Sequence, residues 1–308
     1  MKIAFVFPGQ GSQYVGMGKD LYDNFEEARK IHKEASEALG YDIAEISFNG
    51  PQEELNRTVR TQPALLTVSF AAFKVLTSKG IIPSCVAGHS LGEYTAVVAS
   101  GVISFKDAVK ITEKRGQYMQ EAVPEGKGLM AAILGLERDA VEKICNSVTT
   151  GYVSPANYNC PGQIVIAGEK TAVEEAIRLA GEAGAKRAVP LAVSAPSHCR
   201  LMEKASVRLS ELFDSVVFNP AIIPIVNNAD AVFLQKPEEI KESLIKQLNS
   251  PLLWEDSVRL MIKNAIDTFI EVGPKKVLSG LIKRIDGEVR ILNVEDTKSL
   301  NEALNALA

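Results

Sequence analysis

The pentapeptide Gly88-His89-Ser90-Leu91-Gly92 follows an apolar run at 81–87 and precedes a helix-forming stretch at 93–99. A strand, a sharp turn and a helix form the context in which G-x-S-x-G exposes a serine hydroxyl beside a sheet. Such a turn crowds neighbouring Cβ atoms, so it favours glycines. The serine then lies at a helix N-terminus, where free backbone N–H groups and the helix dipole favour a developing anion. We therefore predict that Ser90 is a nucleophile.

The composition favours a globular enzyme in a reducing compartment. The 308 residues suffice for one large domain or for a domain that carries an insertion. A net charge of −4 argues against a nucleic-acid-binding protein. The four cysteines show no C-x-x-C spacing, which argues against a structural zinc site or a disulfide framework. No apolar run reaches transmembrane length, and the run at 3–7 is too short for a signal peptide. We therefore expect a cytoplasmic protein without a membrane partner.

Strands and helices alternate over most of the chain. Apolar strands are predicted at 3–7, 81–87, 222–226, 268–272 and 290–294. Helices are predicted at 21–40, 64–79, 105–119, 198–213, 237–248, 253–264 and 276–285. Strands that are apolar throughout are typical of a parallel sheet that is covered on both faces.

The middle of the chain has a different order of elements. Strands are predicted at 128–136, 152–157, 162–167 and 188–193, and helices at 138–147 and 171–183. The order β-α-β-β-α-β is that of a ferredoxin-like unit. We therefore predict an α/β fold in two parts. A hydrolase-like large domain with a parallel sheet covers 1–124 and 194–308, and a small ferredoxin-like domain is inserted at 125–193.

Three histidines are available to activate the serine, whose hydroxyl is a weak nucleophile until a base accepts its proton. His32 lies in a charged helical segment and is predicted to be at the surface. His89 is adjacent to Ser90 on a turn that points the two side chains apart, which suits a supporting role. His198 lies in a loop between a strand and a helix, where catalytic groups are common. His198 is therefore the predicted general base.

The interval between Ser90 and His198 offers no obvious third member of a catalytic triad. In α/β-hydrolases an acid lies between the nucleophile and the histidine in chain order. Asp107 and Asp139 are the only aspartates in that interval, and both begin predicted helices. A backbone carbonyl that accepts the Nδ1 hydrogen would fix the histidine tautomer instead. We therefore predict a serine–histidine dyad.

Two further features concern charge at the site. An oxyanion needs two N–H donors, and the backbone of Leu91 and of Gln10, in the loop Pro8-Gly9-Gln10-Gly11, are the candidates. That loop matches neither a dinucleotide fingerprint nor a P-loop. Arg115 lies in an otherwise apolar helix, where a buried guanidinium needs a partner. It is either part of a structural ion pair, a surface residue, or a fork that binds a substrate carboxylate.

Taken together, these motifs resemble those of the malonyl-CoA:acyl carrier protein transacylase family of bacterial fatty acid synthesis. The matching segments extend over nearly the whole chain: FPGQGSQ at 7–13, TQPA at 61–64, GHSLGEY at 88–94, RG at 115–116, NCPGQ at 159–163, PSH at 196–198 and EVGP at 271–274. Several motifs in the right order are far more specific than any one of them.

The resemblance implies a ping-pong transfer by way of a malonyl ester of Ser90, with His198 as base. Malonyl-CoA would be the donor, and the phosphopantetheine thiol of acyl carrier protein the acceptor. The resemblance further implies that Gln10 and Leu91 supply the oxyanion N–H groups and that Arg115 holds the malonyl carboxylate. The main-chain carbonyl of Gln247 would orient the histidine. No cofactor is implied besides these substrates, and we expect a monomer.

Two positions depart from the family pattern, and two other functions stay open. Lys275 stands where the family usually has glycine. Ser197 precedes the catalytic histidine, as is usual in stand-alone malonyl enzymes, although serine goes with methylmalonyl in related domains. A serine hydrolase would need a triad acid, and a non-catalytic docking module would not need the intact set of Ser90, His198 and Arg115. The basic pairs at 275–276 and 283–284 are candidates for docking an acidic carrier protein.

Overall fold

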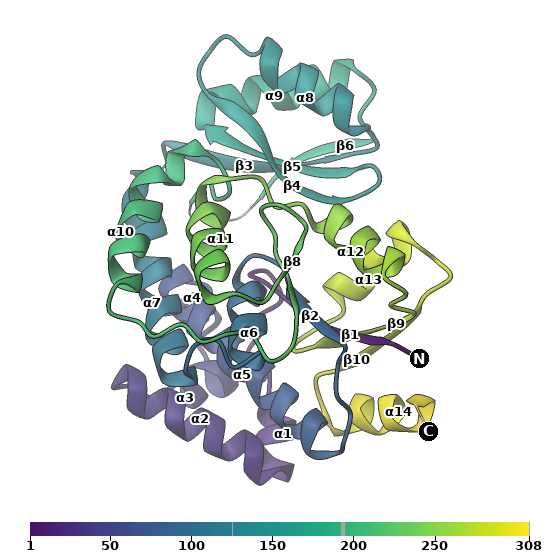
Figure 1. The fold of residues 1–308 in the computed structure, drawn as a ribbon. Coiled ribbons are helices and arrows are strands. Elements are labelled where there is room, and N and C mark those ends of the chain that lie inside the picture. The colour runs from purple at the N-terminus through teal and green to yellow at the C-terminus, as the bar shows by residue number, and fades with distance from the viewer. Residues whose placement is uncertain (125, 192–194, 308) are drawn as a thin grey trace.

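The computed structural model describes residues 1–124, 126–191 and 195–307, and it contains two separate sheets (Figure 1). The larger sheet has the strand order β10-β9-β1-β2-β7-β8. Its strands are β1 (Ile3–Phe7), β2 (Cys85–Gly88), β7 (Ile225–Val226), β8 (Phe233–Leu234), β9 (Thr268–Val272) and β10 (Arg290–Val294). All neighbours pair in parallel except β8, which is antiparallel to β7. The predicted parallel sheet is confirmed, and β8 is an addition to it.

Strand β1 shows that the larger sheet is buried on both faces. Ile3, Phe5 and Phe7 pack into one hydrophobic cluster, and Ala4 and Val6 pack into another. Successive side chains of a strand point to opposite faces, so the sheet is buried on both sides. Helices α5 (Thr58–Ser78), α6 (Leu91–Ala99) and α7 (Phe105–Ala122) contribute to the first cluster, while α12 (Trp254–Lys263) and α13 (Val277–Ile285) contribute to the second.

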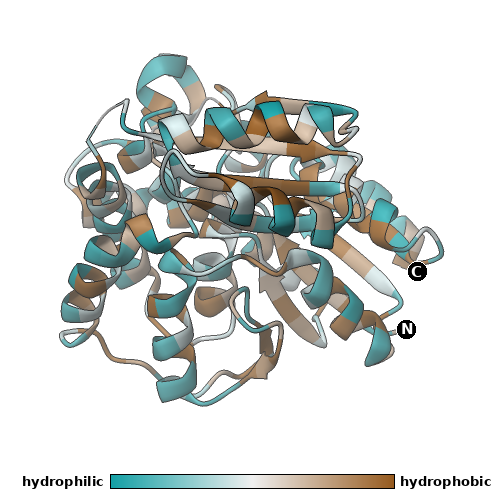
Figure 2. Ribbon diagram, turned by 90° about the horizontal axis from the view of Figure 1, so that it is seen from above, coloured by the Kyte–Doolittle hydropathy of each residue, from teal (hydrophilic) through white to brown (hydrophobic). Residues whose placement is uncertain are grey.

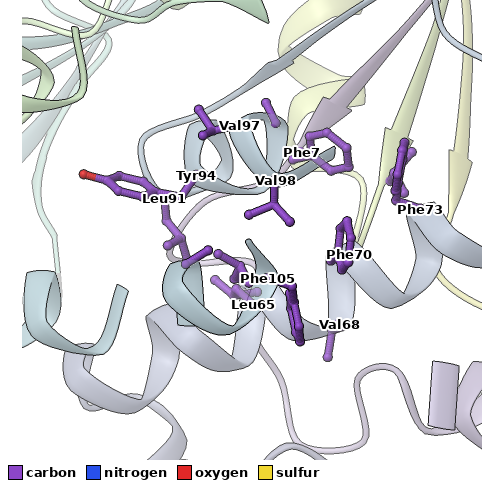
Figure 3. Close-up of a cluster of buried hydrophobic side chains, with 14 of the residues drawn as sticks. Phe7, Leu65, Val68, Phe70, Phe73, Leu91, Tyr94, Val97, Val98 and Phe105 are labelled. Carbon is purple, nitrogen blue, oxygen red and sulfur yellow. The ribbon is translucent and has the colours of Figure 1, made fainter. Parts of the chain in front are cut away.

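The first cluster packs against the turn at 88–92, which we call the elbow, and against the start of α6. Figure 3 shows Phe7 of β1 facing aromatic side chains of α5, with residues of α6 and α7 closing the group. Phe70 stacks on Phe105 with ring centroids 5.0 Å apart, and Phe73 meets Phe7 edge-on at 6.1 Å. Close packing of this kind leaves little room for the start of α6 to move.

Figure 2 shows hydrophilic and hydrophobic residues on different sides of the helices that face the viewer. Further helices belong to the part of the chain with the parallel sheet (Figure 1). They are α1 (Lys19–Asn24), α2 (Glu26–Leu39), α3 (Ile43–Asn49), α4 (Gln52–Leu55), α10 (Glu203–Phe213), α11 (Pro237–Asn249) and α14 (Thr297–Leu307). The helix predicted at 21–40 is broken at Phe25, whose backbone is extended. Helices α3, α4 and α14 were not predicted. Within the part of the chain that the structure describes, no helix has the length and hydrophobicity needed to cross a lipid bilayer.

His32 is buried, so the predicted surface position is wrong. Its Nδ1 lies 2.9 Å from the carbonyl oxygen of Ala28, and its ring packs against Tyr22 and Phe48. The charged neighbours along the chain were misleading, because helix sides follow a period of 3.6 residues. His32 lies four residues after Ala28, on the buried side of α2.

The smaller sheet is antiparallel and has the order β4-β5-β3-β6. It comprises β3 (Gly128–Leu134), β4 (Val153–Cys160), β5 (Gln163–Glu169) and β6 (Arg187–Pro190), with α8 (Arg138–Ser147) and α9 (Lys170–Glu182) packed on one face. This part has a hydrophobic core of its own and lies at one side of the parallel sheet (Figure 1). The ferredoxin-like order of elements is confirmed. The predicted end points of the inserted domain, at 125 and 193, lie outside the described residues.

Candidate active site

The elbow at Ser90 has a backbone that few residues tolerate. Ser90 has φ 53° and ψ −106°, a conformation that is rare for a residue with a side chain. A Cβ on Gly88 would lie 1.9 Å from the carbonyl carbon of Gly92, and a Cβ on Gly92 would lie 2.0 Å from the carbonyl oxygen of Phe7. Both positions therefore require glycine, and the close approach places the serine at the end of β1 and β2.

Asn228 fixes the elbow from the neighbouring strand. Its Oδ1 accepts the backbone N–H of Ser90 at 2.8 Å, and its Nδ2 donates to the carbonyl oxygen of Gly88 at 2.7 Å. Asn228 follows β7, which pairs with β2. Asn228 was not among the site residues predicted from the sequence. The available signal was a polar side chain just after an apolar parallel strand, where functional groups of α/β sheets gather.

The structure brings His198 to Ser90 in hydrogen-bonding geometry. The serine hydroxyl donates to Nε2 at 2.7 Å, and Nδ1 donates to the main-chain carbonyl oxygen of Gln247 at 2.8 Å. The second contact selects the tautomer in which Nε2 is a proton acceptor. His198 is only 1% exposed, and burial together with the charge of Arg115 lowers its pKa to about 3. The imidazole is therefore neutral at physiological pH and able to accept a proton.

Arg115 is buried beside the serine and has neutral partners. Its Nη1 donates to Gln62 Oε1 at 2.8 Å, and its Nη2 donates to Gln247 Oε1 at 2.9 Å and to Ser90 Oγ at 3.2 Å. Its side chain is not at the surface, since only 1% of the residue is exposed. Among the described residues no carboxylate lies within 4.0 Å of its guanidinium nitrogens. The geometry therefore argues against a surface position and, among the described residues, against an ion pair for Arg115.

A cavity of about 210 Å³ opens in front of these groups, between the two sheets. Gln10 and Leu91 both line it, on the side of the elbow. Leu91 is the first residue of α6, a position whose N–H has no acceptor within the helix. The opposite wall comes from the small sheet through Met130, Asn159 and Val165, in agreement with a site enclosed by both parts of the chain.

His89 turns away from the serine. Its Nε2 donates to Asn159 Oδ1 at 2.9 Å, and its ring meets Trp254 edge-on. Burial lowers the pKa of His89, so this histidine is neutral. The contact links the elbow to β4 of the small sheet, which agrees with a supporting position and not with a base at Ser90.

The loop at Lys275 retains the conformation that a glycine would adopt. Lys275 has φ 66°, in the left-handed region, and its Nζ donates to the carbonyl oxygen of Gly11 at 3.1 Å. The lysine thus tolerates the backbone and contacts the loop that carries Gln10. In the described residues no cluster of His, Cys, Asp and Glu could hold a metal ion.

The chain matches known proteins over nearly its whole length. Residues 4–298 match the family model of the acyl transferase domain. A malonyl CoA-acyl carrier protein transacylase of Bacillus subtilis is 47% identical over 99% of this chain and 97% of that protein. The protein of the same name from Escherichia coli K12 is 50% identical over 92% of this chain and 93% of its own.

Solved structures agree with these relatives. An acyl carrier protein S-malonyltransferase from Vibrio cholerae superposes with a TM-score of 0.96 at 50% identity, over 98% of this chain and all of that one. A malonyl-transacylase solved in complex with a type II polyketide acyl carrier protein superposes with a TM-score of 0.97 at 47% identity, over 99% of this chain and all of that one. The chain therefore belongs to the acyl transferase family and, within it, to the malonyl CoA-acyl carrier protein transacylases.

Proposed function

We propose that this protein transfers a malonyl group from malonyl-CoA to the phosphopantetheine thiol of acyl carrier protein, through a malonyl ester of Ser90. The observation that carries the proposal is the buried guanidinium of Arg115, whose Nη2 lies 3.2 Å from the serine hydroxyl. A buried cation without a carboxylate partner is costly, and a substrate carboxylate would relieve that cost. The cavity therefore suits an acyl group that ends in a carboxylate.

The first half of the reaction forms the ester. As Ser90 Oγ attacks the thioester carbonyl, its proton passes to His198 Nε2. The backbone N–H groups of Gln10 and Leu91 would stabilise the oxyanion, while Arg115 holds the distal carboxylate in a bidentate contact. The tetrahedral intermediate then collapses, the C–S bond breaks, and the CoA thiolate takes the proton from the histidine.

The second half runs in reverse with a different thiol. The carrier thiol gives its proton to His198 and attacks the ester, and Ser90 leaves with that proton. We infer that the carrier docks beside α13, because exposed basic residues of α13 and the loop before it flank the cavity, at 275–276 and 283–284. Val277 and Leu278 line the cavity from the same segment. Arg284 also contacts Gln163 and Pro161, which are part of the small-sheet rim.

The remaining expectations fit this reaction. The transfer as written needs no cofactor, because thioester and ester exchange involve no redox step. All four cysteines are buried free thiols, which supports a reducing, cytoplasmic compartment. We propose a monomer, since the groups that the mechanism uses all come from one chain.

Mass spectrometry tests the proposal directly. After mixing with malonyl-CoA, the enzyme should carry a malonyl adduct on Ser90, and holo-acyl carrier protein should remove it. Turnover with an unmodified Ser90 would refute the mechanism. Release of free malonate in place of malonyl-carrier product would favour the serine hydrolase, and turnover that persists in Ser90→Ala would exclude this serine as the nucleophile.

A further inference from the structure

Glu93 is a buried carboxyl group that the mechanism above does not use. It is 2% exposed and lies in the first turn of α6. The spacing of Ser90 and Glu93 is that of a capping box, in which each side chain bonds to the other residue's backbone N–H. Here the serine side chain makes no cap hydrogen bond, and its N–H donates to Asn228. Neither side chain therefore caps the helix. The serine hydroxyl contacts His198, and the glutamate carboxylate contacts another residue.

The carboxylate of Glu93 contacts Gln247 instead. Its Oε2 accepts from Gln247 Nε2 at 2.8 Å and from the backbone N–H of Asn228 at 3.2 Å. The other hydrogen of the Gln247 amide goes to the carbonyl oxygen of Ser90 at 2.9 Å. Neither a carboxylate nor a carbonyl can donate, so these two acceptors fix which way the amide points. Oε1 of Gln247 must then face Arg115.

A flipped amide would disturb the site in two places. Oε1 of Gln247 would meet the oxygens of Glu93 and Ser90, and its NH2 group would meet the guanidinium of Arg115, so Nη2 would lose its acceptor on Gln247. Glu93 also supplies negative charge near Arg115 without occupying its fork. Burial raises the pKa of Glu93 to about 7, and the hydrogen bonds from Gln247 and Asn228 and the charge of Arg115 oppose that rise.

We propose that Glu93 is a positioning residue that fixes the amide of Gln247 and, through it, aims Arg115 at the substrate carboxylate beside Ser90. The proposal rests on the function proposed above, in which Arg115 binds that carboxylate. Glu93 contacts neither the serine hydroxyl nor the general base. Its loss should therefore impair recognition of the acyl carboxylate more than the chemistry of acyl transfer.

The test is a double-mutant cycle read on two substrates, malonyl-CoA and acetyl-CoA. Glu93→Gln keeps the size of the side chain but lets the Gln247 amide take either orientation. We expect kcat/KM for malonyl-CoA to fall about tenfold, mostly through KM, and kcat/KM for acetyl-CoA to change little. Gln247→Met, which keeps the main-chain carbonyl for His198, should lower kcat/KM for malonyl-CoA more than for acetyl-CoA. Glu93→Gln added to Gln247→Met should then cost nothing more.

Glu271→Gln is the matched control. Glu271 is also a buried carboxyl, and it accepts the backbone N–H groups of Leu278 and Ser279 at the start of α13. Its loss should affect folding stability but leave the ratio of malonyl to acetyl activity unchanged. Equal losses for both substrates in Glu93→Gln, or additive losses in the double variant, would overturn the proposal.

Two further outcomes separate this proposal from the function on which it rests. If Glu93→Gln does not fold, Gln247→Met alone decides, because an unchanged substrate ratio in that variant would refute the role of the amide. If Arg115→Ala changes the ratio but both Glu93→Gln and Gln247→Met leave it unchanged, only the positioning role fails. If Arg115→Ala also leaves the ratio unchanged, the carboxylate fork itself fails.

Discussion

The two sheets contribute different things to one cavity. The parallel sheet and its helices hold the groups to which we assign the reaction: Ser90 follows β2, Arg115 lies on α7, and Gln247 lies on α11. The antiparallel sheet supplies a wall, with Met130 on β3 and Val165 on β5. Parallel strands all end at the same edge, so groups that follow several strands converge there. An antiparallel strand instead presents every second side chain on a continuous face, which suits the shaping of a substrate pocket. Changes on the parallel-sheet side should therefore affect rate, and changes on the small sheet should affect substrate choice.

The largest effect is expected at the base. His198→Ala removes the acceptor of the serine proton, and we expect the rate of Ser90 acylation to fall by about a thousandfold. The loss should be equal for malonyl-CoA and acetyl-CoA, because proton transfer does not depend on the distal carboxylate. Rapid-quench mass spectrometry of the acyl-enzyme measures this rate. A loss smaller than about tenfold would mean that the 2.7 Å contact between His198 and Ser90 is not the path of the proton.

The next effect concerns Arg115, which lies on the parallel-sheet side and, like Glu93 and Gln247, should alter substrate choice. Arg115→Ala removes the fork, and we expect kcat/KM for malonyl-CoA to fall at least about tenfold relative to acetyl-CoA, since charge-assisted hydrogen bonds are worth roughly 1.5–3 kcal/mol. Steady-state competition between the two thioesters gives the ratio. Arg115→Lys is the control for charge without the planar fork, and it should recover only part of the preference.

A smaller effect is expected on the wall. Met130 lines the cavity from β3, and Met130→Ala would enlarge the pocket. We expect the preference for malonyl over methylmalonyl thioester to weaken by a few-fold, about 1 kcal/mol or the equivalent of one added methylene. Acylation by acetyl-CoA serves as the control and should stay near the normal rate. A large loss with acetyl-CoA would show that the small sheet also holds reacting groups in place.

The smallest effect on the acylation rate is expected when the pH is lowered. A histidine with an ordinary pKa near 6.5 would gain a proton and stop accepting one as the pH falls from 7.5 to 5.5. Burial, with the charge of Arg115, lowers the pKa of His198 to about 3, so the neutral base persists across this range. Acylation by acetyl-CoA, which has no distal carboxylate, should change less than about twofold. A rate that halves near pH 6.5 would show that the histidine is more accessible to water than the structure indicates.

The free energy of unfolding should depend on pH more strongly than the acylation rate does. The pKa of His198 is lower in the folded chain than in the unfolded chain, so the unfolded state binds the proton first as the pH falls below 6.5. The free energy of unfolding therefore decreases from that point toward pH 3. His198→Gln should flatten this part of the curve, as measured by chemical denaturation at several pH values.

Local patterns in the sequence were sufficient for the elbow and for most elements. The requirement for glycine at positions 88 and 92 was predicted from the sharpness of the turn alone. The structure adds which atoms a Cβ at each position would meet. The alternation of apolar strands predicted the parallel sheet, and the order of elements predicted the small antiparallel one. Short elements such as β8 and α4 were missed, because a few residues carry no measurable periodicity.

Contacts between segments that are distant in the sequence could not be predicted from such local patterns. The partners Ser90 and Gln247 are 157 residues apart, and Gln62 and Arg115 are 53 apart. Asn228 lies in no recognisable motif. Its role follows from the pairing of β7 with β2, which depends on how the sheet is ordered and not on the residues near it.

The sequence by itself determined the glycine-bounded elbow that carries Ser90 and the two kinds of sheet, and it predicted a nucleophile without a triad aspartate. These depend on steric and periodic rules that act within a few residues. Only the tertiary structure decided which carbonyl orients His198, which amide holds Arg115, and that Glu93 faces this amide instead of capping its own helix. Such choices depend on the packing of whole elements against each other, because a hydrogen bond forms only where distance and direction are both satisfied.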